Sequence, residues 1–377
     1  PFYYYDKAII SIDTLKQDAE YRTYLENAYW DIIVIDEAHN VAERGAGSSL
    51  RARLAKLLAR QSDTLIMLSA TPHDGRARSF ASLMNMLDPT AIANPDDYQP
   101  EDIKGLFIRR FKKDIQSQVE RAFKEREIST ARCSASPAEE AAFDAFTRLR
   151  FTQLDKGRTA GELFKTTLEK ALFSSPTACL ATINNRIKRL TKTEDPAYTE
   201  DVHALEDLAG YVERITPKDF SKYQKLLMVI RDPKLGFGWK GKDTGDRLVL
   251  FTERIEMLNF LSANLPHDLG LAKEQVAILH GTLPDVDQNR IVEDFGREEA
   301  PVRLLIASDV AAEGINLHFL SHRMVHFDIP WSLMIFQQRN GRIDRYGQEQ
   351  TPQIAYLVTE SQNAKIRGDT RILELLV

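Results

Sequence analysis

Hydrophobic and polar positions in the first part of the chain follow two alternating patterns. Residues 31–36 (DIIVID) and 64–69 (TLIMLS) are short aliphatic runs bounded by polar residues, a pattern typical of buried strands. Residues 11–30 and 50–60 have the spacing of helices. Strands that alternate with helices predict an α/β protein with a parallel sheet.

The strand pattern disappears from about residue 134 to residue 231. Pro, Gly and Ser separate segments of helical spacing there, at residues 138–150, 160–173, 178–190 and 218–230. We interpret this region as a helical insertion. Strand-like runs then return at residues 247–251, 276–280, 302–307 and 324–328, each followed by a helix-like stretch. They predict a second open parallel sheet.

The predicted organisation is therefore two parallel-sheet lobes joined through a helical insertion, which a chain of 377 residues is long enough to form. We place the first lobe at residues 1–133, the insertion at 134–244 and the second lobe at 245–360. Residues 361–377 are expected to begin a C-terminal extension.

Composition adds little to this picture. Apolar residues make up 43% and charged residues 28%, an ordinary balance for a globular protein. No apolar run is long enough to span a membrane, so no membrane partner is expected. The net charge of −5 does not exclude nucleic acid, because a local cleft sets the field that a ligand meets. Basic clusters at residues 109–113 and 186–192 fit either such a cleft or a solvated surface.

The first candidate site is the sequence Asp36-Glu37-Ala38-His39, which directly follows a predicted buried strand. Ligands of α/β sheets bind at the carboxyl ends of the strands. In nucleotide hydrolysis one carboxylate holds Mg²⁺, and a neighbouring group orients the attacking water. The alternative is a solvated acid pair at the start of a helix. The preceding strand favours the catalytic interpretation.

Two further sites follow strands in the same way. The hydroxyls of Ser69 and Thr71 lie in an SATP sequence after the second predicted strand, where they can relay hydrogen bonds or simply form a turn. The loop after residue 307 contains Asp309, Gly314 and Asn316, and a glycine there allows the backbone to approach a phosphate closely.

The last site lies in residues 338–348 (QRNGRIDRYGQ). Arg342 and Arg345 are three positions apart, so on a helix both would point the same way. Two guanidinium groups on one face can clamp a transferring phosphoryl group. The alternative is an exposed basic face of a helix.

These four sites occur in the order and approximate spacing of motifs two, three, five and six of helicase superfamily two. The chain resembles the Swi/Snf-type ATPases, especially their bacterial branch that associates with RNA polymerase. Further similarity lies in residues 106–110 (LFIRR), 328–332 (DIPWS) and 345–348 (RYGQ). The resemblance covers roughly residues 1–360 and implies two RecA-like lobes with ATP between them, double-stranded DNA as partner and a bacterial cytoplasmic protein.

The resemblance also implies roles for individual residues. Asp36 would hold Mg²⁺, Glu37 would polarise the lytic water, and Arg342 and Arg345 would reach the γ-phosphate. His39, Ser69 and Thr71 would couple the lobes. The remaining expected nucleotide contacts are Asp309, Gly314, Asn316 and Gln338. Positions that hold nucleic-acid backbone in such motors match Thr252, Arg254, His280, Gly281 and Ser308.

One departure from the family concerns the P-loop. The sequence contains no G-x-x-x-x-G-K-[ST]; the nearest stretch, residues 236–242 (GFGWKGK), is followed by Asp243 and precedes a predicted strand. A P-loop instead leaves a strand and opens a helix. We interpret the stretch as a Gly-rich loop and expect the true P-loop before Pro1. The chain alone is then expected neither to bind ATP tightly nor to hydrolyse it.

Four functions are compatible with these motifs. The leading prediction is an ATP-driven translocase on double-stranded DNA that remodels protein–DNA complexes. The motifs equally allow a strand-separating helicase or the motor subunit of a restriction or phage-defence complex. A different class is a docking module without enzymatic activity that binds RNA polymerase or another partner, although such a module has no need for the acid pair or the arginines.

Overall fold

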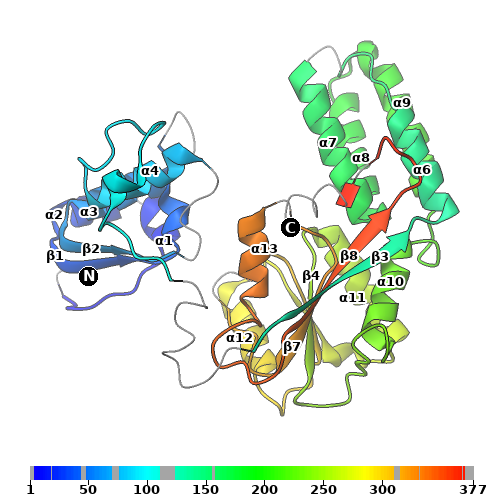
Figure 1. Cartoon of the computed structure of the whole chain (residues 1–377). Helices are drawn as coiled ribbons and strands as arrows, with labels where there is room; N and C mark the ends of the chain where they lie inside the picture. The colour runs from blue at the N-terminus through cyan, green and yellow to red at the C-terminus, as the bar shows by residue number, and fades with distance from the viewer. Residues whose placement is uncertain are drawn as a thin grey trace. The chain divides into compact units, whose positions relative to one another are not determined.

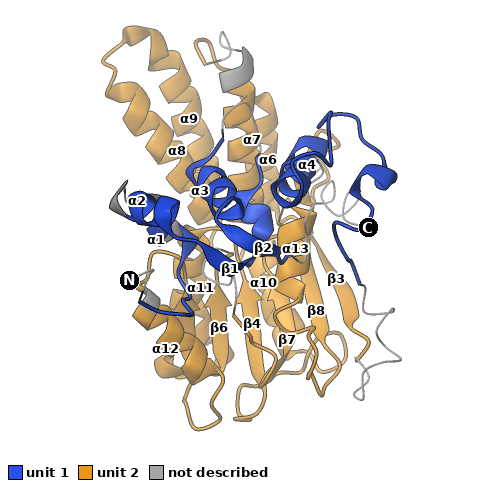
Figure 2. Cartoon of the chain, turned by 90° about the vertical axis from the view of Figure 1, so that its left-hand side faces the viewer, with its two compact units in different colours: residues 1–115 blue, residues 116–377 orange. Residues whose placement is uncertain are grey.

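The computed structural model of the chain contains two compact units, residues 1–115 and 116–377, and we describe each by itself (Figure 2). The structure describes residues 4–17, 19–43, 48–69, 76–110, 124–154, 158–309, 315–330, 332–366 and 368–369. Within these residues, no helix is both long and apolar enough to cross a membrane.

Unit 1 is built around a parallel pair of strands, β1 (Trp30–Ile35) and β2 (Ser62–Met67). They confirm the two strands predicted from the sequence. Helix α3 (Leu50–Ala59) connects them, and the Ser49 side chain caps its first turn by accepting the N–H of Ala52. The other elements among the described residues of the unit are α1 (Ile12–Gln17), α2 (Ala19–Asn27), η1 (Ala38–Val41), α4 (Ala77–Leu87) and η2 (Pro100–Ile103).

The two faces of this small sheet differ in burial. Ile35 packs with Phe80 and Met84 of α4 in the core of the unit. The opposite face exposes four large aliphatic side chains, Ile32, Val34, Ile66 and Leu68. The prediction that residues 31–36 form a fully buried strand is therefore wrong, because helices cover only one face of the described sheet. The uncovered apolar surface is larger than isolated exposed side chains normally provide.

Unit 2 contains a six-stranded sheet with the order β3-β8-β7-β4-β6-β5, and all of its pairings are parallel. Helices α11 (Ile255–Leu269), α12 (Asp285–Phe295) and α13 (Leu333–Asn340) follow strands of this sheet, and η5 (Lys273–Gln275) precedes β5. The strands are β3 (Glu127–Ser134), β4 (Arg247–Phe251), β5 (Val276–Leu279), β6 (Leu304–Ala307), β7 (Ser321–His326) and β8 (Gln353–Glu360). Four of them confirm predicted strands.

Both faces of this sheet are covered. Leu248 and Leu250 of β4 belong to a large core that also includes side chains of α11 and of α10 (Ser221–Arg231). The alternate residues Val249 and Phe251 belong to a second core with Phe295 of α12. Because successive side chains of a strand point to opposite faces, a strand buried on both sides reads as a continuous apolar run, here LVLF after Arg247.

The region between β3 and β4 is helical, as predicted. Its helices are α6 (Pro137–Arg148), α7 (Arg158–Ser174), α8 (Pro176–Thr191), α9 (Thr199–Val212) and α10 (Ser221–Arg231), with η4 (Pro196–Tyr198) before α9. Ser136 and Glu139 form a capping box at the start of α6. Strands β3 and β8 point toward α6–α9 in Figure 1, so this helical group stands at the carboxyl-end side of the sheet.

Strand β3 differs from the predicted boundary at residue 133. It pairs along its whole length with β8, from Glu127 opposite Gln353 to Ser134 opposite Glu360, and so it is part of the second sheet. The sequence EISTARCS is largely exposed at the sheet edge, which explains why it lacks an apolar run. The helical insertion thus leaves and re-enters the same unit.

The residues after β8 fold back onto the helical group. Glu140 of α6 accepts hydrogen bonds from the Ser361 hydroxyl (2.7 Å) and the Gln362 N–H (2.7 Å). Asp369 forms a buried ion pair with Lys222 of α10, with 2.7 Å between Oδ2 and Nζ. The described part of the expected C-terminal extension is therefore integrated into unit 2.

Candidate nucleotide site and its supporting network

The acid pair lies where β1 ends. Asp36 is exposed, and its Oδ1 accepts the N–H of Glu37 at 2.8 Å. Glu37 has left-handed backbone angles (φ 47°, ψ 47°), which cost a non-glycine residue about 1–3 kcal/mol and tend to cluster at functional sites. The next residue, Ala38, returns to the sheet through a hydrogen bond from its N–H to the Leu68 carbonyl (2.8 Å). The turn thus presents both carboxylates at the strand end.

His39 connects this turn to the second strand. Its imidazole is only 4% exposed, and its Nδ1 lies 3.1 Å from the Ser69 hydroxyl and 3.3 Å from Oε2 of Glu37. The structure therefore brings together three residues that the sequence placed in two motifs. Thr71, the other hydroxyl of the second motif, lies outside the described residues.

In unit 2, the central feature is an arginine that the sequence analysis did not select. Arg339, at the end of α13, is 2% exposed and binds Asp309 with two parallel contacts: Nε to Oδ1, and Nη2 to Oδ2 at 2.9 Å. Its Nη1 also donates to the Asp328 carbonyl at 2.8 Å. One guanidinium group thus joins the ends of β6, β7 and α13. Its only sequence signal was its position beside Gln338.

A buried polar chain continues from Arg339. Nδ1 of His326 lies 3.3 Å from Nη1 of Arg339, and Nε2 lies 2.8 Å from Oδ1 of Asn340. Asn340 in turn donates to the Tyr356 hydroxyl at 3.1 Å. Burial, together with the nearby Arg339 charge, lowers the pKa of His326 well below its usual value. The imidazole is therefore neutral near pH 7.

The structure corrects the expected arrangement of Arg342 and Arg345. Helix α13 ends at Asn340, so the two arginines lie in the following turns and do not share a helical face. Arg342 is buried and donates to the Ile315 carbonyl at 3.2 Å, whereas Arg345 is exposed and donates to the Asn316 side chain. Gly341, a residue of low helix propensity, directly follows the last residue of α13.

Both arginines nevertheless contact one segment, residues 315–317, and the N–H of Leu317 donates to the Arg342 carbonyl at 3.1 Å. The expected nucleotide contacts Asn316 and Asp309 thus meet residues of the arginine motif. Gln338 is half-buried on α13, and Gly314 lies outside the described residues.

The expected nucleic-acid contacts lie at the carboxyl ends of β4, β5 and β6. Thr252 is fully buried, and its hydroxyl donates to Oδ2 of Asp328 at 2.5 Å. Ser308 is 6% exposed. The other three are more accessible: Gly281 is exposed, while Arg254 and His280 are half-buried, and His280 Nδ1 lies 2.7 Å from the Thr282 hydroxyl. The sheet therefore gathers these residues at one edge, although the Thr252 hydroxyl is engaged internally.

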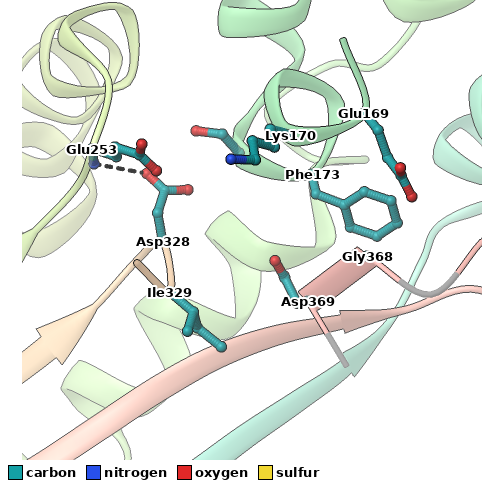
Figure 3. Close-up of a pocket in the computed structure, with 9 residues that line it drawn as sticks. Glu169, Lys170, Phe173, Glu253, Asp328, Ile329, Gly368 and Asp369 are labelled. Atoms are coloured by element: carbon teal, nitrogen blue, oxygen red, sulfur yellow. Dashed lines mark hydrogen bonds between the residues drawn. The ribbon is translucent and has the colours of Figure 1, made fainter. Parts of the chain in front are cut away.

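A small cavity lies beside this edge, between α7 and the Asp328 turn (Figure 3). Glu253 and Asp328 face it from the sheet, and Lys170, Phe173 and Asp369 line it from the helical group and the C-terminal segment. It encloses about 20 Å³, room for about one water molecule. This volume excludes a nucleotide.

Comparison with known proteins matches the chain to helicases. A family profile described as the helicase conserved C-terminal domain matches residues 222–347. The uncharacterized ATP-dependent helicase YqhH of Bacillus subtilis is 26% identical over 94% of this chain and 60% of its own length. The RNA polymerase-associated protein RapA of Pectobacterium carotovorum is 26% identical over 97% of this chain and 39% of its own length.

Among solved structures, the SWI2/SNF2 ATPase core of Sulfolobus solfataricus in complex with double-stranded DNA matches 92% of this chain and 67% of its own. Its sequence identity is 20% and its TM-score 0.38. The C-terminal part of the Fun30 ATPase domain matches 67% of this chain and 90% of its own, with 15% identity and a TM-score of 0.42. The present chain spans 60% and 39% of the lengths of YqhH and RapA.

The parallel-sheet units make the chain an α/β protein. The profile match and these relatives make it similar to ATP-dependent helicases. Over nearly its whole length it is similar to the bacterial RapA proteins, which supports the resemblance to the Swi/Snf-type group.

Proposed function

We propose that this chain forms the motor part of an ATP-dependent translocase that moves on double-stranded DNA and remodels protein–DNA complexes. The observation that carries the proposal is the turn after β1: Asp36 and Glu37 lie together there, and His39 contacts both Glu37 and Ser69, which follows β2. This arrangement joins an acid pair to a hydrogen-bonded relay, as nucleotide hydrolysis coupled to motion requires.

In unit 1, the roles that we propose for Asp36 and Glu37 follow from how far each side chain is exposed to solvent. The exposed carboxylate of Asp36 suits Mg²⁺, which prefers carboxylate oxygens and keeps several waters. When bound with ATP, Mg²⁺ would neutralise charge on the phosphates. Glu37 is half-buried, its Oε2 lies 3.3 Å from Nδ1 of His39, and we assign it the role of accepting a proton from the attacking water. The contact between His39 and Ser69 would transmit changes at this turn to the second strand.

In unit 2, Arg345 is the better candidate for contact with the γ-phosphate. Its exposed side chain is held by one hydrogen bond to Asn316, whereas Arg342 is buried against the Ile315 carbonyl. An exposed guanidinium can exchange an amide partner for a phosphate, to which it binds more strongly. We therefore assign Arg345 the direct role and Arg342 the role of holding the segment at residues 315–317.

The proposed DNA contacts are the accessible groups at the carboxyl edge of the second sheet. Arg254, His280 and Gly281 there offer a cation, an imidazole and an exposed backbone. Contacts of this kind bind phosphates and do not read bases. The proposal therefore predicts binding with little sequence preference and an affinity that falls steeply with salt.

The test compares hydrolysis with motion in the intact gene product. ATP turnover stimulated by duplex DNA, together with ATP-dependent displacement of a third strand from a DNA triplex without separation of the duplex, would support a translocase. Strand separation of a forked duplex would instead identify a strand-separating helicase. If duplex DNA neither binds nor stimulates turnover, the proposal is wrong.

A second candidate role, association with RNA polymerase, is favoured by the name of the RapA relatives. Such a role is compatible with a motor and adds a partner to it. Co-purification of the intact gene product with RNA polymerase, retained after nuclease treatment, would support direct association. Loss of the interaction after nuclease treatment would show that DNA bridges the two proteins.

A further inference from the structure

The Gly-rich stretch at residues 236–242, which is not a P-loop, folds into a defined structure. Backbone hydrogen bonds fix it to the end of α10: the Phe237 N–H donates to the Val229 carbonyl (2.7 Å) and the Trp239 N–H to the Ile230 carbonyl (2.8 Å). Gly241 has a φ of +63°, and a Cβ there would lie 2.6 Å from the Leu271 side chain. The glycine therefore allows the loop to close against α11's end.

This loop forms one wall of a cup at the amino-end side of the second sheet. The cup encloses about 390 Å³ and is bounded by the end of α11 and by residues that directly precede β5 and β6. The proposed nucleic-acid contacts lie at the carboxyl ends of the same strands, the end toward which the arrows in Figure 1 point. The cup is therefore on the opposite edge of the sheet from those contacts.

The charged side chains that line the cup are all cationic: Arg231, Lys240, Lys242 and Arg303. Within the described part of the chain, none of the four forms an ion pair with a carboxylate. Lys240 and Lys242 are exposed and alternate along the loop. A concave surface lined by charges of one sign raises the local concentration of oppositely charged ligands.

Arg303 is the buried member of this group. Arg303 is only 8% exposed, and its Nη1 donates to the carbonyls of Ala300 (2.7 Å) and Val302 (2.9 Å). Its buried Nε has no hydrogen-bond partner among the described residues. The two Nη1 bonds fix the guanidinium where it lines the cup. Burial and the Arg303 charge also lower the pKa of neighbouring Arg247 to about 10.

We propose that this cup binds a small phosphate-bearing anion of nucleotide size. The volume falls within the range of small-molecule sites, and Trp239 and Leu271 supply an apolar wall beside the four cations. Lysines bind phosphates as point charges and arginines as planar donors, so the set suits a diphosphate or triphosphate group. A concave cup favours a compact ligand over the extended backbone of a nucleic acid. The proposal is independent of the motor function.

Isothermal titration of the intact gene product with pyrophosphate, at fixed ionic strength, tests the proposal. The double variant Lys240→Gln/Lys242→Gln should lose at least about tenfold in affinity, because two charge-assisted contacts are removed. The matched control is Lys218→Gln/Lys234→Gln, which changes the charge equally at two exposed lysines outside the cup and should bind like the wild type. Arg303→Lys, which keeps the charge without the fork, should also bind more weakly.

Two outcomes would overturn the proposal. Equal pyrophosphate affinity in the wild type and in the Lys240→Gln/Lys242→Gln variant would place the anion elsewhere. Binding of a short DNA duplex that depends on Lys240 and Lys242, without any binding of pyrophosphate, would make the cup a nucleic-acid contact. Thermal unfolding of each variant shows whether the fold is intact, and the lysine variants are expected to be unaffected because both side chains are exposed.

Discussion

Arg339 and Asp309 bind each other through two parallel contacts although thirty positions separate them in the chain. Asp309 follows β6, and Arg339 closes α13. The pair therefore fixes the end of β6 relative to the turns that carry Arg342 and Arg345. The same guanidinium holds the Asp328 carbonyl, which adds the end of β7 to this junction.

Replacing Arg339 should destabilise unit 2. Arg339→Ala leaves Asp309 without its partner in a largely buried site, which typically costs about 3–5 kcal/mol. The double variant Arg339→Met/Asp309→Leu should lose less, because it leaves no unpaired charge. Urea unfolding followed by circular dichroism measures both. A double variant less stable than Arg339→Ala would show that the ion pair is not the reason for the loss.

Glu37→Gln should preserve ATP binding and lower turnover in the intact gene product by about 10²–10⁴, as the loss of a general base typically does. The glutamine keeps the size of the side chain and its position beside His39. The matched control is Glu101→Gln, an exposed glutamate elsewhere in unit 1, which should have wild-type turnover. Near wild-type turnover of Glu37→Gln would exclude the assigned role.

The two arginines of the last motif should respond differently. Arg345→Ala should abolish DNA-stimulated hydrolysis and leave thermal stability unchanged, since the side chain is exposed. Arg342→Ala should lower both DNA-stimulated hydrolysis and thermal stability, because its buried guanidinium donates to the Ile315 carbonyl. Arg345→Lys should restore little activity, because lysine lacks the planar fork. Full activity of Arg345→Lys would show that only the positive charge of Arg345 matters. Arg297→Ala, at an exposed arginine, is the control and should have wild-type activity.

Unit 2 should become less stable as the pH falls below about 6.5, the usual pKa of histidine. Burial lowers the pKa of His318, His322 and His326 in the folded protein, so the unfolded chain binds more protons in this window. Each histidine contributes a loss of at most about 1.4 kcal/mol per pH unit below that value. Urea unfolding at pH 7.5 and pH 5.5 measures the sum, and His326→Gln should make the dependence shallower.

Several parts of the fold could be predicted from sequence because burial on both faces leaves a continuous apolar run. The strand at Arg247–Phe251 was predicted with its correct bounds, and the predicted helices at residues 138–150 and 178–190 match α6 and α8 closely. Strand β3 could not be found in this way, since an exposed edge strand needs neither an apolar run nor strict alternation.

The sequence predicts those residues of the candidate site that lie in recognisable motifs. His39 and Ser69 were assigned to one function from two motifs, and they are in contact. Arg339 was missed because a buried arginine and an exposed one look alike in a sequence, and its burial depends on strands far away in the chain. The helix end after Asn340 also separates Arg342 from Arg345, which residue spacing alone does not reveal.

The position of β3 has a mechanical consequence. The chain enters unit 2 through this edge strand, which lies parallel to β8 over eight residue pairs from Glu127 to Ser134. Tension applied along the strand loads the ladder of hydrogen bonds simultaneously, in shear, instead of opening it one bond at a time. The helical insertion follows β3 in the chain and is not part of the β3–β8 pair that carries the load. In the motor proposed above, β3 would transmit such a pull to the sheet without stretching the insertion.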